Sequence, residues 1–167
     1  MGAKNVRWST ATFEKLKRPD TVVVFPVLDD GRIILTEQEQ PGRTGGFIGA
    51  AGGRVDPGED TLAAAKRELL EETGYTAENF ILWDAQQPTT KIDWAVFSLV
   101  AKGLKKVSDL ELDAGERIKL KPVTFDEFLD IATTMYFAEK EIVIKIMEAK
   151  LDPKKMESLR ALFNPRA

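Results

Sequence analysis

The sequence contains no cysteine and no histidine. The absence of cysteine excludes disulfide frameworks, zinc–thiolate centres and cysteine nucleophiles. The absence of histidine excludes Ser-His-Asp hydrolysis, histidine-based phosphotransfer and histidine-ligated zinc. Acid–base chemistry must therefore come from Asp, Glu, Lys or Tyr. Any metal must be held by oxygen ligands, which favours Mg²⁺ or Mn²⁺.

The chain also lacks a long apolar run and an excess of basic residues. No stretch approaches the roughly 18 apolar residues of a membrane span, and residues 1–7 do not resemble a secretion signal. We therefore expect a cytoplasmic protein with no membrane partner. The formal net charge is −3, and general nucleic-acid binding usually needs a basic face. We accordingly expect no nucleic-acid partner.

What is present indicates one globular domain. The 167 residues are 43% hydrophobic and 31% charged, without internal repeats or low-complexity linkers. A chain of this size buries roughly 70% of its unfolded surface on folding, which is enough for a full core.

Local patterns predict strands and helices in a definite order. Residues 21–28 and 32–36 form strands joined as a hairpin by the turn 29–31. Further strands are expected at 47–48, running into Gly52 and Gly53, at 80–83, at 94–101 and at 118–124, the last at a sheet edge because of Pro122. Helices are expected at 62–73, ended by Gly74, at 125–132 and at 138–151. This order predicts an α/β fold in which a mixed sheet lies between helices.

The most specific pattern lies between Gly53 and Tyr75. In template form it reads G-x5-E-x7-R-E-U-x-E-E-x-G-U, where U is apolar or aromatic. Within its predicted helix, Glu68, Glu71 and Glu72 fall within roughly 100° of arc on one face. Carboxylates this close repel one another unless a cation lies among them. A solvent-exposed acidic helix face is the alternative for these three residues taken alone.

The complete pattern resembles the box of the Nudix hydrolase family. Seven fixed residues at about 6% usage each would match a given start by chance on the order of once in 10⁸ or 10⁹. The resemblance implies a Nudix-type α/β/α sandwich over residues 21–167, with the box at 53–75. It also implies hydrolysis of a nucleoside diphosphate linked to another moiety, by attack of water on phosphorus.

The same resemblance assigns roles to residues of the box. Metal ligands would be the carboxylates of Glu68, Glu71 and Glu72 and the backbone carbonyl of Gly52. Glu59 and Arg67 would orient the loop and the helix by pairing with each other. Mg²⁺, with Mn²⁺ able to substitute, would bridge enzyme and diphosphate and acidify a bound water.

Segments around the box resemble the ADP-ribose pyrophosphatase branch of the family, at residues 36–41, at 49–59 and at Pro88. This implies cleavage of a nucleoside diphosphate sugar such as ADP-ribose to a nucleoside monophosphate and a sugar phosphate. It also implies a homodimer in which the N-terminal arm, residues 1–20, is exchanged. The chain departs from the branch because no arginine follows Gln38 until Arg43, and because Gly49 and Ala51 replace an acidic residue and a proline. Another nucleotide sugar therefore stays open.

Candidates outside the box complete the predicted site. The branch takes a further carboxylate from a later loop, for which Glu116 is the first candidate as base or additional metal ligand, before Asp113 and Glu111. Arg43 and Arg54 are candidates for substrate contacts. Trp8 and Trp94 are candidates for stacking on the base, with core or interface packing as the alternative.

Two other functions stay open. One is a pyrophosphatase that removes damaged nucleoside triphosphates, which would release pyrophosphate. The other is a non-catalytic Nudix-fold nucleotide sensor. The intact carboxylates of the box favour an enzyme over a sensor.

Overall fold

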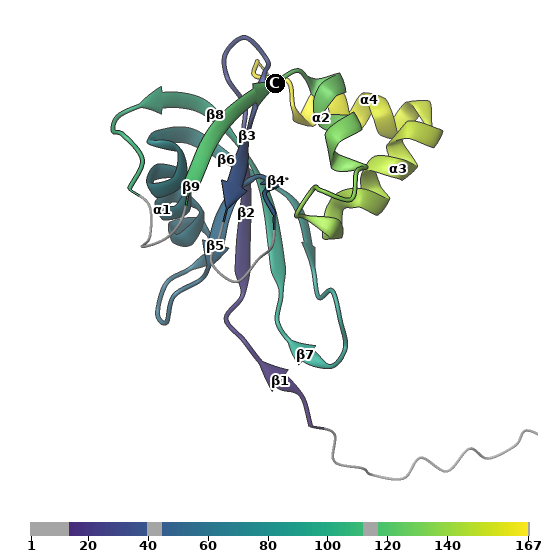
Figure 1. Cartoon of the computed structure of the whole chain (residues 1–167). Coiled ribbons are helices and arrows are strands. Elements are labelled where there is room, and N and C mark those ends of the chain that lie inside the picture. Colours follow the sequence, from purple (N-terminus) through teal and green to yellow (C-terminus); the bar gives the residue numbers. More distant parts are fainter. Residues whose placement is uncertain (1–13, 40–44, 112–116, 167) are drawn as a thin grey trace, which may run out of the picture.

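A computed structural model describes residues 14–39, 45–111 and 117–166 of the chain (Figure 1). The strands are β1 (Leu16–Lys17), β2 (Thr21–Pro26), β3 (Ile33–Glu39), β4 (Phe47–Gly49), β5 (Ala51–Arg54), β6 (Tyr75–Gln86), β7 (Ile92–Asp93), β8 (Val96–Lys106) and β9 (Arg117–Val123). The helices are α1 (Thr61–Thr73), α2 (Phe125–Ala132), the 3-10 turn η1 (Lys140–Ile142), α3 (Val143–Leu151) and α4 (Pro153–Leu162).

The strands are distributed over three sheets. One has the order β5-β2-β8-β6, a second has the order β4-β3-β9, and β1 pairs with β7. In the first sheet β2 and β8 run parallel, whereas β5 and β6 are antiparallel to their neighbours. This sheet is therefore mixed, as the sequence predicted. In the second sheet β9 is an edge strand, which confirms the position inferred from Pro122.

Helix α1 forms one outer layer of the fold. Its buried residues include Ala64, Ala65 and Leu69, which pack on Val22 and Val24 of β2. These β2 side chains share one face of the strand because their spacing is two residues. The small alanines let the helix approach the sheet closely, and this brings its acidic residues next to the strands.

The other helices form the opposite layer. In Figure 1 α2, α3 and α4 lie on the far side of the strands from α1. Phe25 of β2 meets this layer, with its ring centroid 5.6 Å from that of Phe128 and 6.2 Å from that of Phe163. Since β2 buries both of its faces, it lies at the centre of the molecule. The α/β/α sandwich is confirmed.

The hairpin prediction for β2 and β3 is correct only at its turn. Gly31 has a φ of 86° and donates its N–H to the carbonyl of Leu28, at 2.8 Å. Beyond a single bridge between Val27 and Ile33, the two strands enter different sheets. The physical reason is that β2, buried on both faces, pairs along its length with β5 and β8.

The predicted single helix at 138–151 is also corrected. Its first residues are extended, because Ala138 donates its N–H to the carbonyl of Ile48 and Phe137 forms a bridge with the same residue. Helical structure therefore begins only at Lys140. A further helix, α4, follows at Pro153; its start is capped by Asp152, whose side chain accepts the N–H of Lys154.

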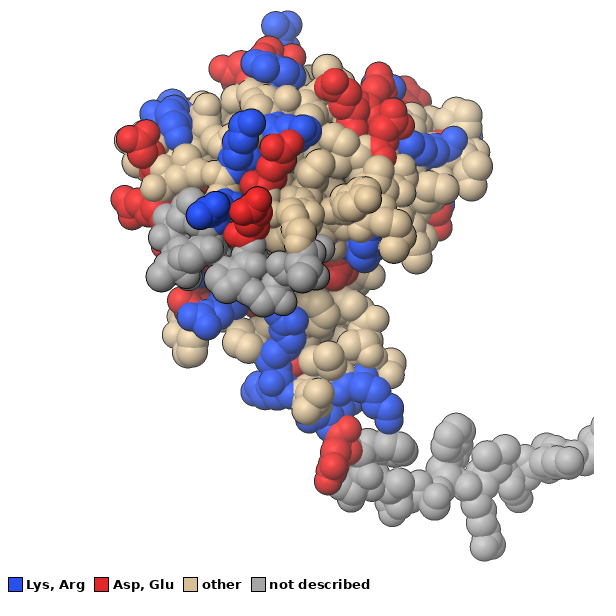
Figure 2. All heavy atoms as spheres, viewed as in Figure 1, with Lys and Arg blue, Asp and Glu red and all other residues tan. Residues whose placement is uncertain are grey.

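Charge is mixed over the surface seen in Figure 2. Acidic and basic side chains are interspersed on this face, and several basic side chains lie near β1 and β7. Among the described residues, no helix has the length and apolar character needed to cross a membrane.

Candidate active site

The box folds as a loop, a helix and a turn. Gly58 has a φ of 84°, in the region that favours glycine, and allows the tight turn before the helix. Asp60 caps α1 by accepting the N–H of Ala63 at 2.7 Å. Gly74, with a φ of 69°, ends the helix and donates its N–H to Leu70, as the sequence predicted. These three features fix where α1 begins and ends.

Arg67 joins the acidic residues of the box into one network. Its Nε donates to Glu59 Oε1 at 3.1 Å and its Nη2 to Glu59 Oε2 at 3.0 Å. Its Nη1 donates to Glu68 at 2.7 Å and to Glu71 at 3.1 Å. Nη2 also donates to the carbonyl of Arg54, at 2.9 Å. The planar fork of arginine makes the two-point contact with Glu59 possible.

The charges within this network reinforce one another. Hydrogen bonds from Arg67 hold the pKa of the Glu59 carboxyl below its usual range. Hydrogen bonds to Glu59, and then to Glu68 and Glu71, raise the pKa of the Arg67 guanidinium further above its already high value. Arg67 and Glu59 therefore stay ionised and paired at neutral pH, as the resemblance implied.

Two carboxylates are buried against the glycine-rich strand β5. Only 8% of the surface of Glu68 and 6% of that of Glu72 is exposed to solvent. Glu72 Oε2 accepts the N–H of Gly52 at 3.0 Å. A Cβ atom on Gly53 would lie 2.4 Å from Glu68 Oε1. Gly53 therefore leaves the space that the Glu68 carboxylate occupies.

The donor set of this cluster suits a hard divalent cation. Glu68, Glu71 and Glu72 offer carboxylate oxygens, the ligands that Mg²⁺ prefers. As these side chains lie, no three acidic residues within the described ranges are grouped to hold a metal ion. Arg67 bonds to Glu68 and Glu71 instead. The chemistry of the residues fits the metal, and because Arg67 bonds only one oxygen of Glu68 and one of Glu71, binding through all three requires the carboxylates to be shared between Arg67 and the cation.

Substitutions of the two glycines of β5 are expected to differ in their effects on stability and activity. We expect Gly53→Ala to keep the fold and to lower activity strongly, because its Cβ displaces the flexible Glu68 carboxylate. We expect Gly52→Ala to destabilise the protein by about 2 kcal/mol, because its Cβ would lie 2.2 Å from the carbonyl oxygen of Val22, which belongs to the backbone. Thermal unfolding and turnover of both variants test this pair; equal loss of stability in the two would contradict it.

The remaining predicted residues are placed in different ways. Arg54 offers its carbonyl to Arg67, while its own Nε pairs with Asp56 at 3.1 Å. Trp94 donates its indole N–H to Thr21 at 3.0 Å, with the guanidinium carbon of Arg18 4.3 Å from its ring centroid. Glu111 donates its backbone N–H to the carbonyl of Glu71 at 2.8 Å. Trp8, Arg43, Asp113 and Glu116 lie outside the described residues.

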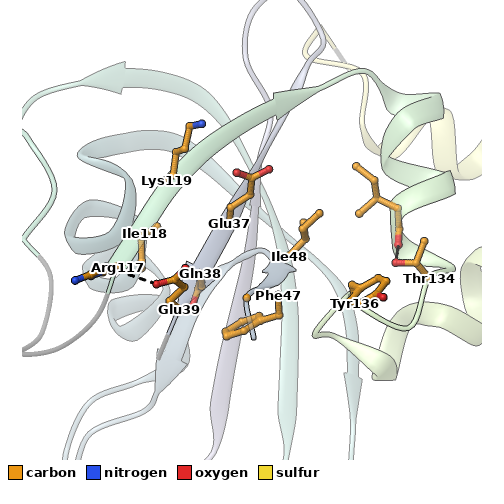
Figure 3. Close-up of a pocket in the computed structure, with 12 residues that line it drawn as sticks. Glu37, Gln38, Glu39, Phe47, Ile48, Arg117, Ile118, Lys119, Thr134 and Tyr136 are labelled. Atoms are coloured by element: carbon orange, nitrogen blue, oxygen red, sulfur yellow. Dashed lines mark hydrogen bonds and ion pairs between the residues drawn. The ribbon is translucent and has the colours of Figure 1, made fainter. Parts of the chain in front are cut away.

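A hollow of about 650 Å³ opens on the second sheet, beside the residues that follow α2 (Figure 3). Its lining comprises Glu37, Gln38, Glu39, Gly46, Phe47, Ile48, Arg117, Ile118, Lys119, Ile131, Thr134 and Tyr136. Ile48, Glu37 and Lys119 are register partners on adjacent strands and form one row across it. The hollow thus has apolar and charged parts side by side.

The hollow includes residues that the sequence patterns did not single out. Tyr136 is one of the lining residues, and it is 71% exposed to solvent. Glu139 also lies against β4, outside the lining, since a Cβ on Gly49 would lie 2.8 Å from its Oε1. Neither belongs to a motif, and both reach β4 only because the segment after α2 pairs with Ile48. The one signal in the sequence was an aromatic residue, Tyr136, between two predicted helices, whereas Glu139 fell inside the second of them, at 138–151.

Comparison with known proteins gives relatives in sequence and a solved structure of similar fold. The chain is 30% identical over 85% of its length to a methanol dehydrogenase activator from Bacillus methanolicus, of which it covers 78%. It is 29% identical over 82% of its length to an ADP-ribose pyrophosphatase from Bacillus subtilis (strain 168), of which it covers 76%. A crystal structure of an ADP compounds hydrolase matches with a TM-score of 0.67 and 25% identity, over 79% of this chain and 71% of that one.

The family model gives the same result over most of the chain. The model described as NUDIX domain matches residues 17–146, which include all of the described box with its network around Arg67. Because this match covers well over half of the 167 residues, the chain belongs to the Nudix hydrolase family.

Proposed function

We propose that the protein hydrolyses the pyrophosphate bond of a nucleoside diphosphate sugar such as ADP-ribose, giving a nucleoside monophosphate and a sugar phosphate. The observation that carries the proposal is the cluster at β5 and α1, where Glu68 and Glu72 are buried beside Gly52 and Gly53. The similarity to an ADP-ribose pyrophosphatase supports the substrate class.

The proposal assigns the metal to this cluster. Glu68, Glu71 and Glu72, with the carbonyl of Gly52, would hold Mg²⁺, and Mn²⁺ would substitute. The metal would neutralise the diphosphate and acidify a water molecule. Arg67 contributes by holding Glu68 and Glu71 on one side of the helix, and Glu59 holds Arg67 in turn. Arg67 and Glu59 are therefore positioning residues.

Other parts of the proposal rest on the family resemblance. Glu116 is proposed as base or additional metal ligand, and Arg43, Arg54, Trp8 and Trp94 as substrate contacts. A cytoplasmic homodimer with exchanged arms, residues 1–20, also stays a prediction. The described part of the arm pairs with its own chain, because Leu16 donates its N–H to the carbonyl of Lys91 at 3.0 Å. An exchange would therefore involve residues before β1.

The substrate proposal is tested by product analysis. We expect the purified protein with Mg²⁺ to convert ADP-ribose to AMP and ribose 5-phosphate, without release of pyrophosphate. A panel of other nucleoside diphosphate sugars and of nucleoside triphosphates, with and without EDTA, serves as the comparison. Pyrophosphate release from triphosphates alone would indicate the sanitising activity. Nucleotide binding without any turnover, with Mg²⁺ or Mn²⁺, would indicate the sensor.

A further inference from the structure

We propose that the hollow beside β3, β4 and β9 receives the nucleoside of the substrate, and that Tyr136 provides the surface on which its base stacks. This inference rests on the proposed function for the nature of the substrate. It assigns a specificity role to a residue outside the box.

The lining suits an uncharged, flat group. Phe47, Ile48, Ile118, Ile131 and Tyr136 supply apolar surface. The charged residues of the lining are two acids, Glu37 and Glu39, and two bases, Arg117 and Lys119. Oε2 of Glu39 lies 3.8 Å from Nη1 of Arg117. Oε1 of Glu37 lies 2.5 Å from Nζ of Lys121, which is not part of the lining. Two acids and two bases give the lining itself no net formal charge, and Lys121 adds one positive charge beside Glu37. The larger gain therefore goes to a nucleobase, through the aromatic and aliphatic surface.

Tyr136 has the exposure expected of a stacking surface. Its side chain contributes little to the core, since it is 71% exposed. Its backbone is fixed, because its carbonyl accepts the N–H of Ile48 at 3.0 Å. Figure 3 shows the ring across the hollow from the side chains of β3 and β9, with Ile48 and Phe47 between. A large aromatic ring held open at the rim of a cavity is typical of a binding site.

The carboxylates of Glu37 and Glu39 suit the ribose. Both follow the two-residue spacing of β3 and therefore lie on one face of the strand. Ionised carboxylates accept hydrogen bonds from hydroxyl groups. The ion pair with Lys121 lowers the pKa of Glu37, so this acceptor stays ionised at neutral pH. A nucleoside thus finds a stacking surface on one side of the hollow and hydroxyl acceptors on the other.

The hollow lies within reach of the box along the chain. Ile48 precedes Gly52 by four residues, so the two are separated by at most about 14 Å. This limit is compatible with a nucleoside in the hollow whose diphosphate extends toward Gly52 and the carboxylates of α1.

Substitution of Tyr136 tests the assignment. We expect Tyr136→Ala to raise the KM for ADP-ribose about tenfold with little change in kcat, because the base loses the ring on which it stacks. Tyr136→Phe keeps the ring face and should stay within about twofold of the wild type. The matched control is Met135→Ala, a neighbour that is 86% exposed and does not line the hollow. Its KM should equal that of the wild type.

Calorimetric binding of the products separates this inference from the proposed function. We expect Tyr136→Ala to weaken binding of AMP by a similar factor and to leave binding of ribose 5-phosphate unchanged. Unaltered KM and AMP affinity in Tyr136→Ala would overturn the assignment, as would weaker binding of ribose 5-phosphate alone. If no nucleotide sugar is turned over but Tyr136→Ala weakens AMP binding, the proposed function fails and the nucleoside site stands.

Discussion

Replacing Glu72 by glutamine is expected to lower kcat by several orders of magnitude, about a thousandfold, while the protein stays folded. Glutamine has nearly the same volume, and its side-chain carbonyl can still accept the N–H of Gly52, which Glu72 binds at 3.0 Å. What the change removes is the negative charge beside Gly52 and Glu68. The proposed metal would be held by oxygen ligands, because the chain has no histidine or cysteine, so losing one anionic ligand should weaken metal binding strongly.

Three measurements check this expectation. Turnover of ADP-ribose should fall, the far-ultraviolet circular dichroism spectrum should stay unchanged, and the rise in unfolding temperature on adding Mg²⁺ should shrink. The control is Glu78→Gln, which removes an exposed carboxylate outside the box that is paired with Lys105 at 2.9 Å. Its turnover should match the wild type. Full activity of Glu72→Gln would refute a catalytic role for the cluster.

Replacing Arg67 by methionine is expected to reduce both activity and stability. Methionine keeps the aliphatic bulk but removes the hydrogen bonds to Glu59, Glu68 and Glu71. The side chain of Arg67 is 29% exposed, and solvent screens part of the loss, so we expect destabilisation of about 2 kcal/mol. Turnover should fall at least about a hundredfold, because Glu68 and Glu71 lose the group that holds them in place.

Lysine and a distant arginine serve as comparisons. Arg67→Lys restores a charge without the planar fork and should recover stability more than activity. Arg160→Met removes an exposed ion pair, 2.6 Å from Asp126, and should change the stability by less than about 1 kcal/mol. Chemical denaturation and turnover measure both properties. A similar loss in Arg160→Met and Arg67→Met would argue against a special role for the network.

The loss of stability in Arg67→Met should depend on pH. Arg67 holds the pKa of Glu59 below its ordinary value of 4.5. A depressed carboxyl pKa contributes stability above the unfolded value and loses it as the pH falls through the folded value. The difference in unfolding free energy between wild type and Arg67→Met should therefore be largest at neutral pH. It should narrow below about pH 4.

Local patterns predicted most of the elements that carry the site. The helix 62–73, its end at Gly74 and the edge position of Pro122 agree with the structure. Such features depend on neighbours within one or two turns of chain, and the sequence contains that information directly. The prediction of one helix at 138–151 was wrong for the opposite reason. Its first residues are held extended by Ile48, which is about ninety positions away.

The sequence by itself determined which side chains are available for metal binding in this protein. The spacing of the box places Glu68, Glu71 and Glu72 on one helix face, and the absence of histidine and cysteine leaves carboxylates as the available metal ligands. Periodicity is sufficient for this, because a helix of fixed pitch converts spacing into position. The pairing of Glu59 with Arg67, implied by the family resemblance, is also present in the structure.

Only the tertiary structure decided what surrounds that chemistry. Glu37, Ile48, Lys119 and Tyr136 come together because β3 pairs with β4 on one side and β9 on the other, and because the segment after α2 joins the edge of β4. None of these contacts follows from local spacing, since sheet register depends on which faces are buried across distant strands. The proposed nucleoside site is a product of that register, whereas the box is encoded within one short stretch of chain.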